Sequence, residues 1–191
     1  MIGRMRNTVG KVTLLRSGQV LFAIVVLAGL SGCAMSADPA AMAIAPQASD
    51  QPFPQPFLHA MCVRNVSGGE DTNPLWVSKV DDKGFRAAMV SSLDSAELSG
   101  STGGCSYPID INLLGLSQPA MGFDMTVMSH VNYKVYDSSG QPFLLETIDA
   151  PYTAKFSDAF AGTERLKLAN EGSIRKSIQM FFDKLRASKP K

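Results

Sequence analysis

The clearest pattern along the chain is an alternation of apolar and polar residues between positions 123 and 135. The apolar set is Phe123, Met125, Val127, Val131, Tyr133 and Val135, and the polar set includes Asp124, Thr126, His130, Asn132 and Lys134. A period of two places the first set on one face of a strand and the second set toward water. Turn residues follow at 137–140, so residues 142–153 are expected to return as the antiparallel partner in a hairpin.

Two other segments carry apolar residues at helical spacing. The first can be capped by Asp81 or Asp82 and ends near residue 98. Its stripe consists of Phe85, Met89, Ser92 and Ala96. The second segment spans 163–185, and its stripe consists of Leu166, Ala169, Ile174, Ile178, Phe181 and Leu185. Each of the two segments is therefore expected to be a helix with one apolar face.

Strands are also expected at 57–66 and 107–116, which gives the order strand, helix, strand, strand, strand, helix. A helix between the first two strands favours a right-handed crossover and parallel pairing. We therefore predict an α+β fold (β-α-β-β-β-α): a four-stranded, antiparallel-rich sheet with two helices packed on one face. On the other face, Met128 and Tyr136 interrupt the polar set, either as ordinary exposed residues or as part of a contact patch.

The first 32 residues have the layout of a secretory signal. Four basic residues precede an apolar run at 20–30, which is too short to cross a bilayer because a spanning helix needs roughly 20 residues. The run ends in Leu30-Ser31-Gly32-Cys33, which matches the lipobox of bacterial lipoproteins. We predict that residues 1–32 are removed and that Cys33 is lipidated; the alternative is an ordinary signal peptide with an incidental cysteine. By resemblance to enterobacterial sorting, Ala34 favours the outer membrane.

Charge and composition divide the rest of the chain. All acidic residues follow Cys33, so removal of the basic leader leaves a mildly acidic protein with no electrostatic footprint for nucleic acid. Residues 33–56 are rich in Ala and Pro and show no apolar period, which predicts a flexible tether after the lipidated cysteine. Residues 57–188 are then expected to form a single periplasmic domain.

Two cysteines, Cys62 and Cys105, remain in the expected domain. The periplasm is oxidising, so a pair there is expected to form a disulfide. The alternatives are two buried thiols or a metal pair, and the second is disfavoured because two cysteines alone make a poor metal site.

A candidate contact for a partner lies in the loop after the first strand. Gly68-Gly69 is followed by Asn73 and by Trp76, which is the only tryptophan. Aromatic anchors are enriched at binding hot spots, so these four residues are candidates for partner binding. The alternative is that Trp76 folds back over an edge of the core.

The sequence offers little for catalysis. His59 and His130 are the only histidines, and no nucleophile elbow, P-loop, dinucleotide fingerprint or zinc-protease motif occurs. The paired acids at 70–71 and 81–82 are interpreted as loop and capping residues. We therefore expect a protein that is not an enzyme and holds no cofactor or metal.

With the lipobox, tether and element order assembled, the chain resembles small Gram-negative envelope lipoproteins. The nearest type is the lipopolysaccharide-assembly lipoprotein, with two helices on a four-stranded sheet. The loop motif above and a second motif, Arg165…Ala169-Asn170-Glu171…Ile174-Arg175, are similar to those of uncharacterised lipoproteins of this layout. In the second motif, Arg165, Glu171 and Arg175 are expected on the solvated helix face as an exposed ion-pair ladder.

The resemblance implies a non-catalytic binding or assembly role in the envelope. The partner would be an envelope protein or a lipopolysaccharide-like ligand, with the membrane bound through the lipid anchor. The alternatives are an auxiliary lipoprotein of an envelope lipid-transport system or an envelope enzyme.

Overall fold

The computed structural model describes residues 34–48, 50–73, 77–100 and 105–190. The main elements are β1 (Met61–Ser67), α3 (Asp82–Ser95), β2 (Tyr107–Ser117), β3 (Met125–Tyr136), β4 (Pro142–Ala154) and α4 (Gly162–Ala187). Two short helices, α2 (Pro39–Met42) and the 3-10 turn η1 (Gln55–Phe57), precede them. The predicted β-α-β-β-β-α order is confirmed. In the described part of the chain, no helix is both long and apolar enough to span a bilayer.

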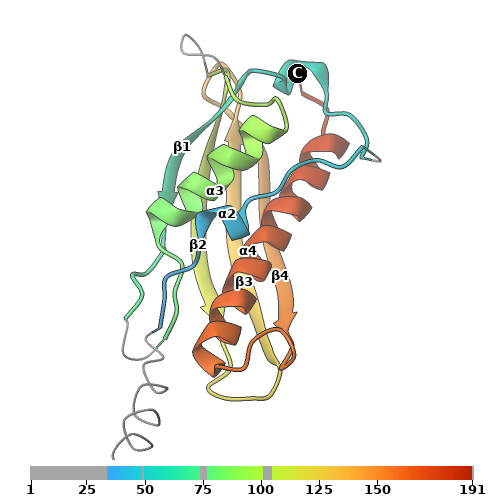
Figure 1. The fold of residues 1–191 in the computed structure, drawn as a ribbon. Coiled ribbons are helices and arrows are strands. Elements are labelled where there is room, and N and C mark those ends of the chain that lie inside the picture. Colours follow the sequence, from blue (N-terminus) through green and yellow to red (C-terminus); the bar gives the residue numbers. More distant parts are fainter. Residues whose placement is uncertain (1–33, 49, 74–76, 101–104, 191) are drawn as a thin grey trace, which may run out of the picture. The chain divides into compact units, whose positions relative to one another are not determined.

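The four strands form one mixed sheet in the order β1-β2-β3-β4. β1 pairs with β2 in parallel, as expected for a crossover through α3. β2 with β3 and β3 with β4 pair in antiparallel fashion, so the predicted hairpin is confirmed. Figure 1 shows α3 and α4 on the same face of the sheet, with the short α2 between them. The opposite face is called the open face below.

The core lies between the sheet and the two long helices. Tyr133 of β3 is fully buried and stacks on Phe181 of α4, with ring centroids 4.3 Å apart. Its hydroxyl lies 2.9 Å from the hydroxyl of Ser177, so the one polar atom of this core side chain is paired. Every residue of both predicted helical stripes is buried. The apolar periodicity therefore identified the inner faces of both helices correctly.

Two details at the strand ends differ from the sequence expectation. β3 begins at Met125, and Phe123, expected on the buried face, is 80% exposed. Asp124 accepts a hydrogen bond from the backbone N–H of Phe156 (2.9 Å), so the chain here follows a loop instead of the sheet. β1 begins at Met61 because a turn ends at Phe57 and His59 adopts a left-handed backbone with φ of 56°.

The larger correction concerns the expected tether. Residues 34–44 are called the N-terminal strap below, and its helix α2 packs between α3 and α4 (Figure 1). Met42 is fully buried, and Phe53 further along the supposed tether is buried as well. The apolar side chains gain more from this burial than the segment loses in freedom. The described part of the Ala- and Pro-rich segment is therefore part of the fold and does not act as a flexible linker.

Hydrogen bonds fasten the strap to both helices. The backbone N–H of Asp38 donates to the carboxylate of Glu171 in α4 (2.7 Å), and Arg175 one turn later donates to the carbonyl oxygen of Ala41 (2.8 Å). On the other side, the N–H of Ile44 donates to the hydroxyl of Ser92 in α3 (3.0 Å). Polar side chains of two helices thus satisfy backbone groups of the strap that would otherwise be buried without partners.

Candidate functional site

The glycine pair of the first candidate motif closes a tight corner. Gly68 has φ of +86°, and a side chain there would collide with the carbonyl oxygen of Leu113 in β2. The N–H of Gly69 donates to the carboxylate of Asp82 at the start of α3 (2.7 Å). A side chain on Gly69 would also meet the backbone of Asp82. Close approach of β1, β2 and α3 therefore accounts for both glycines.

Of the remaining two residues of that motif, the structure describes Asn73 but not Trp76. Asn73 forms an isolated bridge with Val77, which closes the loop. Trp76 lies outside the described residues, so its candidate role stays a prediction. Beside the loop is a hollow of about 140 Å³, lined by Gly68, Glu70, Lys79, Val80, Leu113, Gly115 and Leu116. Ligand pockets usually have roughly 300–1,000 Å³, so this hollow suits one side chain of a partner better than a lipid.

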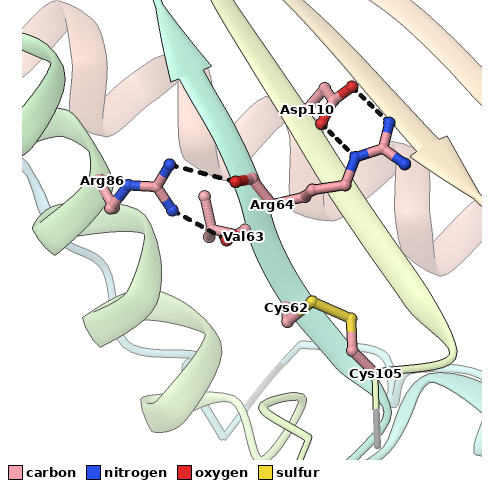
Figure 2. Close-up of a disulfide and its surroundings, with 6 residues drawn as sticks. All are labelled: Cys62, Val63, Arg64, Arg86, Cys105 and Asp110. Carbon is pink, nitrogen blue, oxygen red and sulfur yellow. Dashed lines mark hydrogen bonds and ion pairs between the residues drawn. A yellow bond between two sulfur atoms is a disulfide. The ribbon is translucent and has the colours of Figure 1, made fainter.

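The disulfide predicted between Cys62 and Cys105 is present, with Cα atoms 5.7 Å apart. Figure 2 shows that it joins β1 to the segment leading into β2. In the same view, Arg86 of α3 donates to the carbonyl oxygens of Val63 (2.8 Å) and Arg64 (3.3 Å). The edge strand β1 is thus held covalently at one point and by α3 at another.

Arg64 itself projects onto the open face. It donates two hydrogen bonds to Asp110 of β2, at 2.8 and 2.6 Å, and its guanidinium lies over the ring of Tyr136. The hydrogen bond from Arg64 lowers the pKa of Asp110, and the same bond raises the pKa of Arg64. Tyr136, one of the two residues that interrupt the polar set, thus has a local packing partner.

A second polar array crosses three strands of the open face. Ser117 Oγ of β2 lies 3.0 Å from His130 Nε2 of β3, and His130 Nδ1 lies 2.7 Å from the carboxylate of Asp149 in β4. The connectivity is that of a nucleophile, a base and an orienting acid. The His130 side chain is 33% exposed and that of Asp149 is 60% exposed, so the array is open to water. Sequence analysis singled out His130 but not its two partners.

The second motif, on α4, differs from its expectation. Arg165 and Glu171 are buried, so neither belongs to the solvated helix face. Asn170 donates to the carbonyl oxygen of Ser78 (2.9 Å), and Gln118 donates to the side-chain oxygen of Asn170 (2.7 Å). The motif therefore holds other segments of the chain in place. Its side chains bind the strap, the loop before α3 and the loop after β2 to one helix, α4.

The lipid-attachment residue predicted from the sequence, Cys33, lies immediately before the first described residue. Among the described residues, no group of three or more His, Cys, Asp or Glu side chains is placed to hold a metal ion. The structure thus brings together two sets of polar side chains. One set forms hydrogen bonds across the open face, and the other, on α4, binds the backbone of neighbouring segments.

The fold is that of a small disulfide-bonded α+β domain. No family model and no curated protein matches the sequence. A Caulobacter crescentus protein described as a candidate lipoprotein aligns over 53% of this chain and 80% of its own, at 14% identity and a TM-score of 0.38. A minor lipoprotein from Acinetobacter baumannii aligns over 65% and 93%, at 10% identity and a TM-score of 0.40. A Xanthomonas campestris protein of the DUF330 family aligns over 75% and 91%, at 11% identity and a TM-score of 0.46.

Proposed function

We propose that the protein is an envelope lipoprotein, acylated on Cys33 and facing the periplasm, with a non-catalytic binding or assembly role. The observation that carries this proposal is the lipobox Leu30-Ser31-Gly32-Cys33 directly ahead of a folded, disulfide-bonded domain. Burial is found at Ala34 and Ala37 of the strap, which follow Cys33 closely in the sequence. Acyl chains contribute about 0.8 kcal/mol per buried methylene, which makes two or more chains a stable anchor.

The anchor is tested by mass analysis of the exported protein and by membrane fractionation. The expected N-terminus is Cys33 carrying acyl mass, and the variant Cys33→Ala is expected to accumulate as unprocessed precursor. The matched control is Cys105→Ala, which removes a cysteine outside the lipobox and is expected to be processed and anchored normally. A mature N-terminus elsewhere, or one without acyl mass, would overturn the proposal.

The open face is the surface we propose for the partner. Polar side chains surround a shallow hollow of about 210 Å³, lined by Asn65, Ser67, Asp110, Ile111, Asn112, Asn132 and Lys134. This volume is below that of usual small-molecule sites, and the lining is polar, so the surface suits another protein better than the acyl chains of a lipopolysaccharide. No described helix covers this face of the sheet (Figure 1).

In-cell photo-crosslinking tests the surface. A photoreactive residue at Asn132 or Lys134 is expected to give the same discrete protein adduct. A probe at Lys176, exposed on α4 on the opposite side of the sheet, serves as the control and is expected to give none. The adduct should also weaken in Asp110→Arg, which reverses a charge on the lining. Equal adducts from all three positions would contradict a specific interface on the open face.

A second candidate function rests on the array of Ser117, His130 and Asp149. Its distances are those of a serine hydrolase, in which the base takes the proton of the nucleophile. Against catalysis stands its exposure to water, since hydrolase sites stabilise the reaction in a sheltered pocket. A fluorophosphonate probe separates the two functions. Labelling of Ser117 that is lost in His130→Ala would establish a hydrolase, and an unlabelled protein would leave the binding role.

A further inference from the structure

Four large apolar side chains gather where the sheet ends, in the loops after β2 and after β4. This aromatic end consists of Met121 (84% exposed), Phe123 (80%), Phe156 (43%) and Phe160 (89%). The ring centroids of Phe123 and Phe156 lie 5.7 Å apart, and those of Phe156 and Phe160 lie 5.8 Å apart. Contiguous exposed apolar groups of this kind mark a contact with a partner or a membrane.

The aromatic end is held in place by a buried arginine. Arg165, 6% exposed, donates to the carbonyl oxygens of Ala159 (2.6 Å) and Phe160 (2.7 Å). Its guanidinium also lies 4.9 Å from the ring of Phe156, and its other terminal nitrogen lies 3.5 Å from the carbonyl oxygen of Gly122. One side chain thus fixes both loops. Because Arg165 holds the backbone at Ala159 and Phe160, the phenylalanine rings of this end remain exposed outside the core.

The route of the strap leads toward this end of the fold. Ala41 is bonded to Arg175 and Asp38 to Glu171, so going backward along the strap leads toward the start of α4, where Arg165 lies. Figure 1 shows the first described residues and the loops after β2 and β4 at the same end of the sheet. The helix from Glu171 back to Gly162 rises about 13 Å. The five residues from Asp38 back to Cys33 can span up to about 17 Å, so the acylated cysteine can lie level with the aromatic end.

We propose that Met121, Phe123, Phe156 and Phe160 insert into the interfacial region of the same bilayer that holds the acyl chains of Cys33. The inference rests on the proposed acylation. Two observations favour a bilayer over a protein as the occupant. The short docked strap keeps the aromatic end close to the lipid surface. In addition, Met35, two residues from the anchor in the sequence, is 60% exposed.

The contact would set the orientation of the domain. Interfacial insertion of apolar side chains holds a peripheral protein at a fixed depth. The charged residues of the two loops are of both signs, with Asp124 and Asp158 against Lys155, so attraction to anionic lipids is not the driving force. The strands then stand with the aromatic end at the membrane and the C-terminus away from it (Figure 1). In this orientation the open face is presented sideways to a partner.

The experiment uses the acylated mature protein in vesicles of phosphatidylethanolamine and phosphatidylglycerol whose acyl chains carry bromine. In a Trp76→Phe background, Phe160→Trp reports on the aromatic end and Leu145→Trp, 57% exposed nearer the start of β4, is the matched control. We expect fluorescence of Phe160→Trp to be quenched severalfold and shifted to the blue, with Leu145→Trp unchanged, and little response to added salt. Quenching at both positions would contradict insertion of the aromatic end and leave the proposed acyl anchor standing. Quenching at neither position, in a protein that still floats with the vesicles, would have the same meaning. Failure to float overturns both.

A second measurement needs no substitution. Hydrogen exchange of the acylated wild-type protein is measured once in vesicles and once in dilute detergent that keeps the protein in solution, and the two exchange rates are compared. Slower exchange with vesicles is expected at 119–124 and 155–161, and no change is expected in the turn at 137–140. Equal exchange of the two loops in both settings would contradict insertion, whatever the tryptophan variants show.

Discussion

The carboxylate of Glu171 accepts a hydrogen bond of 2.7 Å from the backbone N–H of Asp38, although 133 positions separate the two residues in the sequence. Glu171 is buried, and its charge is balanced by Lys167, 2.9 Å away. Desolvation acts to lower the pKa of Lys167, but the hydrogen bond and charge of Glu171 outweigh it and the pKa is raised. This relationship makes the N-terminal strap part of the folded domain.

Removing the carboxylate is expected to release the strap. Glu171→Ala leaves the N–H of Asp38 without its acceptor and the ammonium of Lys167 without its nearer carboxylate. Hydrogen bonds to charged groups contribute about 1.5–3 kcal/mol. The free energy of unfolding in urea should fall by that amount, and amide exchange at 37–44 should accelerate. The control is Glu164→Ala on the same helix, whose exposed pairing with Lys167 at 3.7 Å should contribute only a few tenths of a kcal/mol. Equal losses would show that the strap does not depend on Glu171.

The Cys62–Cys105 disulfide is expected to contribute up to about 4 kcal/mol, because it closes a long loop in the unfolded chain. In Cys62→Ala/Cys105→Ala the urea midpoint should drop accordingly. Thiol labelling of the denatured wild type should be negative before reduction and positive after it. Cys62→Ala alone is the internal control, since it should leave Cys105 as one reactive thiol. Labelling of unreduced wild type at either cysteine would rule out the bridge.

The pattern of the sequence predicted the elements of the fold well, for a physical reason. The alternation along β3 and the stripes on α3 and α4 report the face that each element buries, which is a local property. The strap could not be found in this way, because α2 has only four residues and its burial depends on a groove between helices distant in sequence. Asp38-Pro39, a capping residue followed by a proline, was the one local signal.

The open-face array was hidden for a different reason. His130 pairs with Gly115 on one side and Asp149 on the other, and the register of β2 shifts between Leu113 and Gly115. A bulge changes which side chains meet across strands, so no pattern within one strand could bring Ser117 to His130. The disulfide was predictable because only two cysteines follow Cys33, and two cysteines leave one pairing.

The Arg64–Asp110 pair makes a prediction for pH. Because the folded-state pKa of Asp110 is lowered below 3.8, its stabilisation is present above that value and is lost as pH falls through the folded pKa. Both side chains are partly exposed, so water screens the coupling at neutral pH and it should be weak. A double-mutant cycle with Arg64→Ala and Asp110→Asn should show a coupling energy that vanishes in strong acid and shrinks with salt. A coupling that grows on acidification would contradict the assignment.

Replacing a glycine can destabilise a fold in two ways, through its left-handed backbone or through a collision of the new side chain. Gly68 and Gly140 allow the two effects to be measured separately. Both have positive φ, at 86° and 78°, but only at Gly68 would a side chain collide with backbone, since nothing lies within 4 Å of the position at Gly140. Gly140→Ala should therefore cost about 1–2 kcal/mol for the left-handed backbone alone. Gly68→Ala should cost clearly more, because β1 must also move away from the carbonyl of Leu113. Urea denaturation of the two variants gives the comparison. Equal losses would mean that the corner yields easily, and the glycine pair would then need an explanation beyond packing, such as contact with the partner.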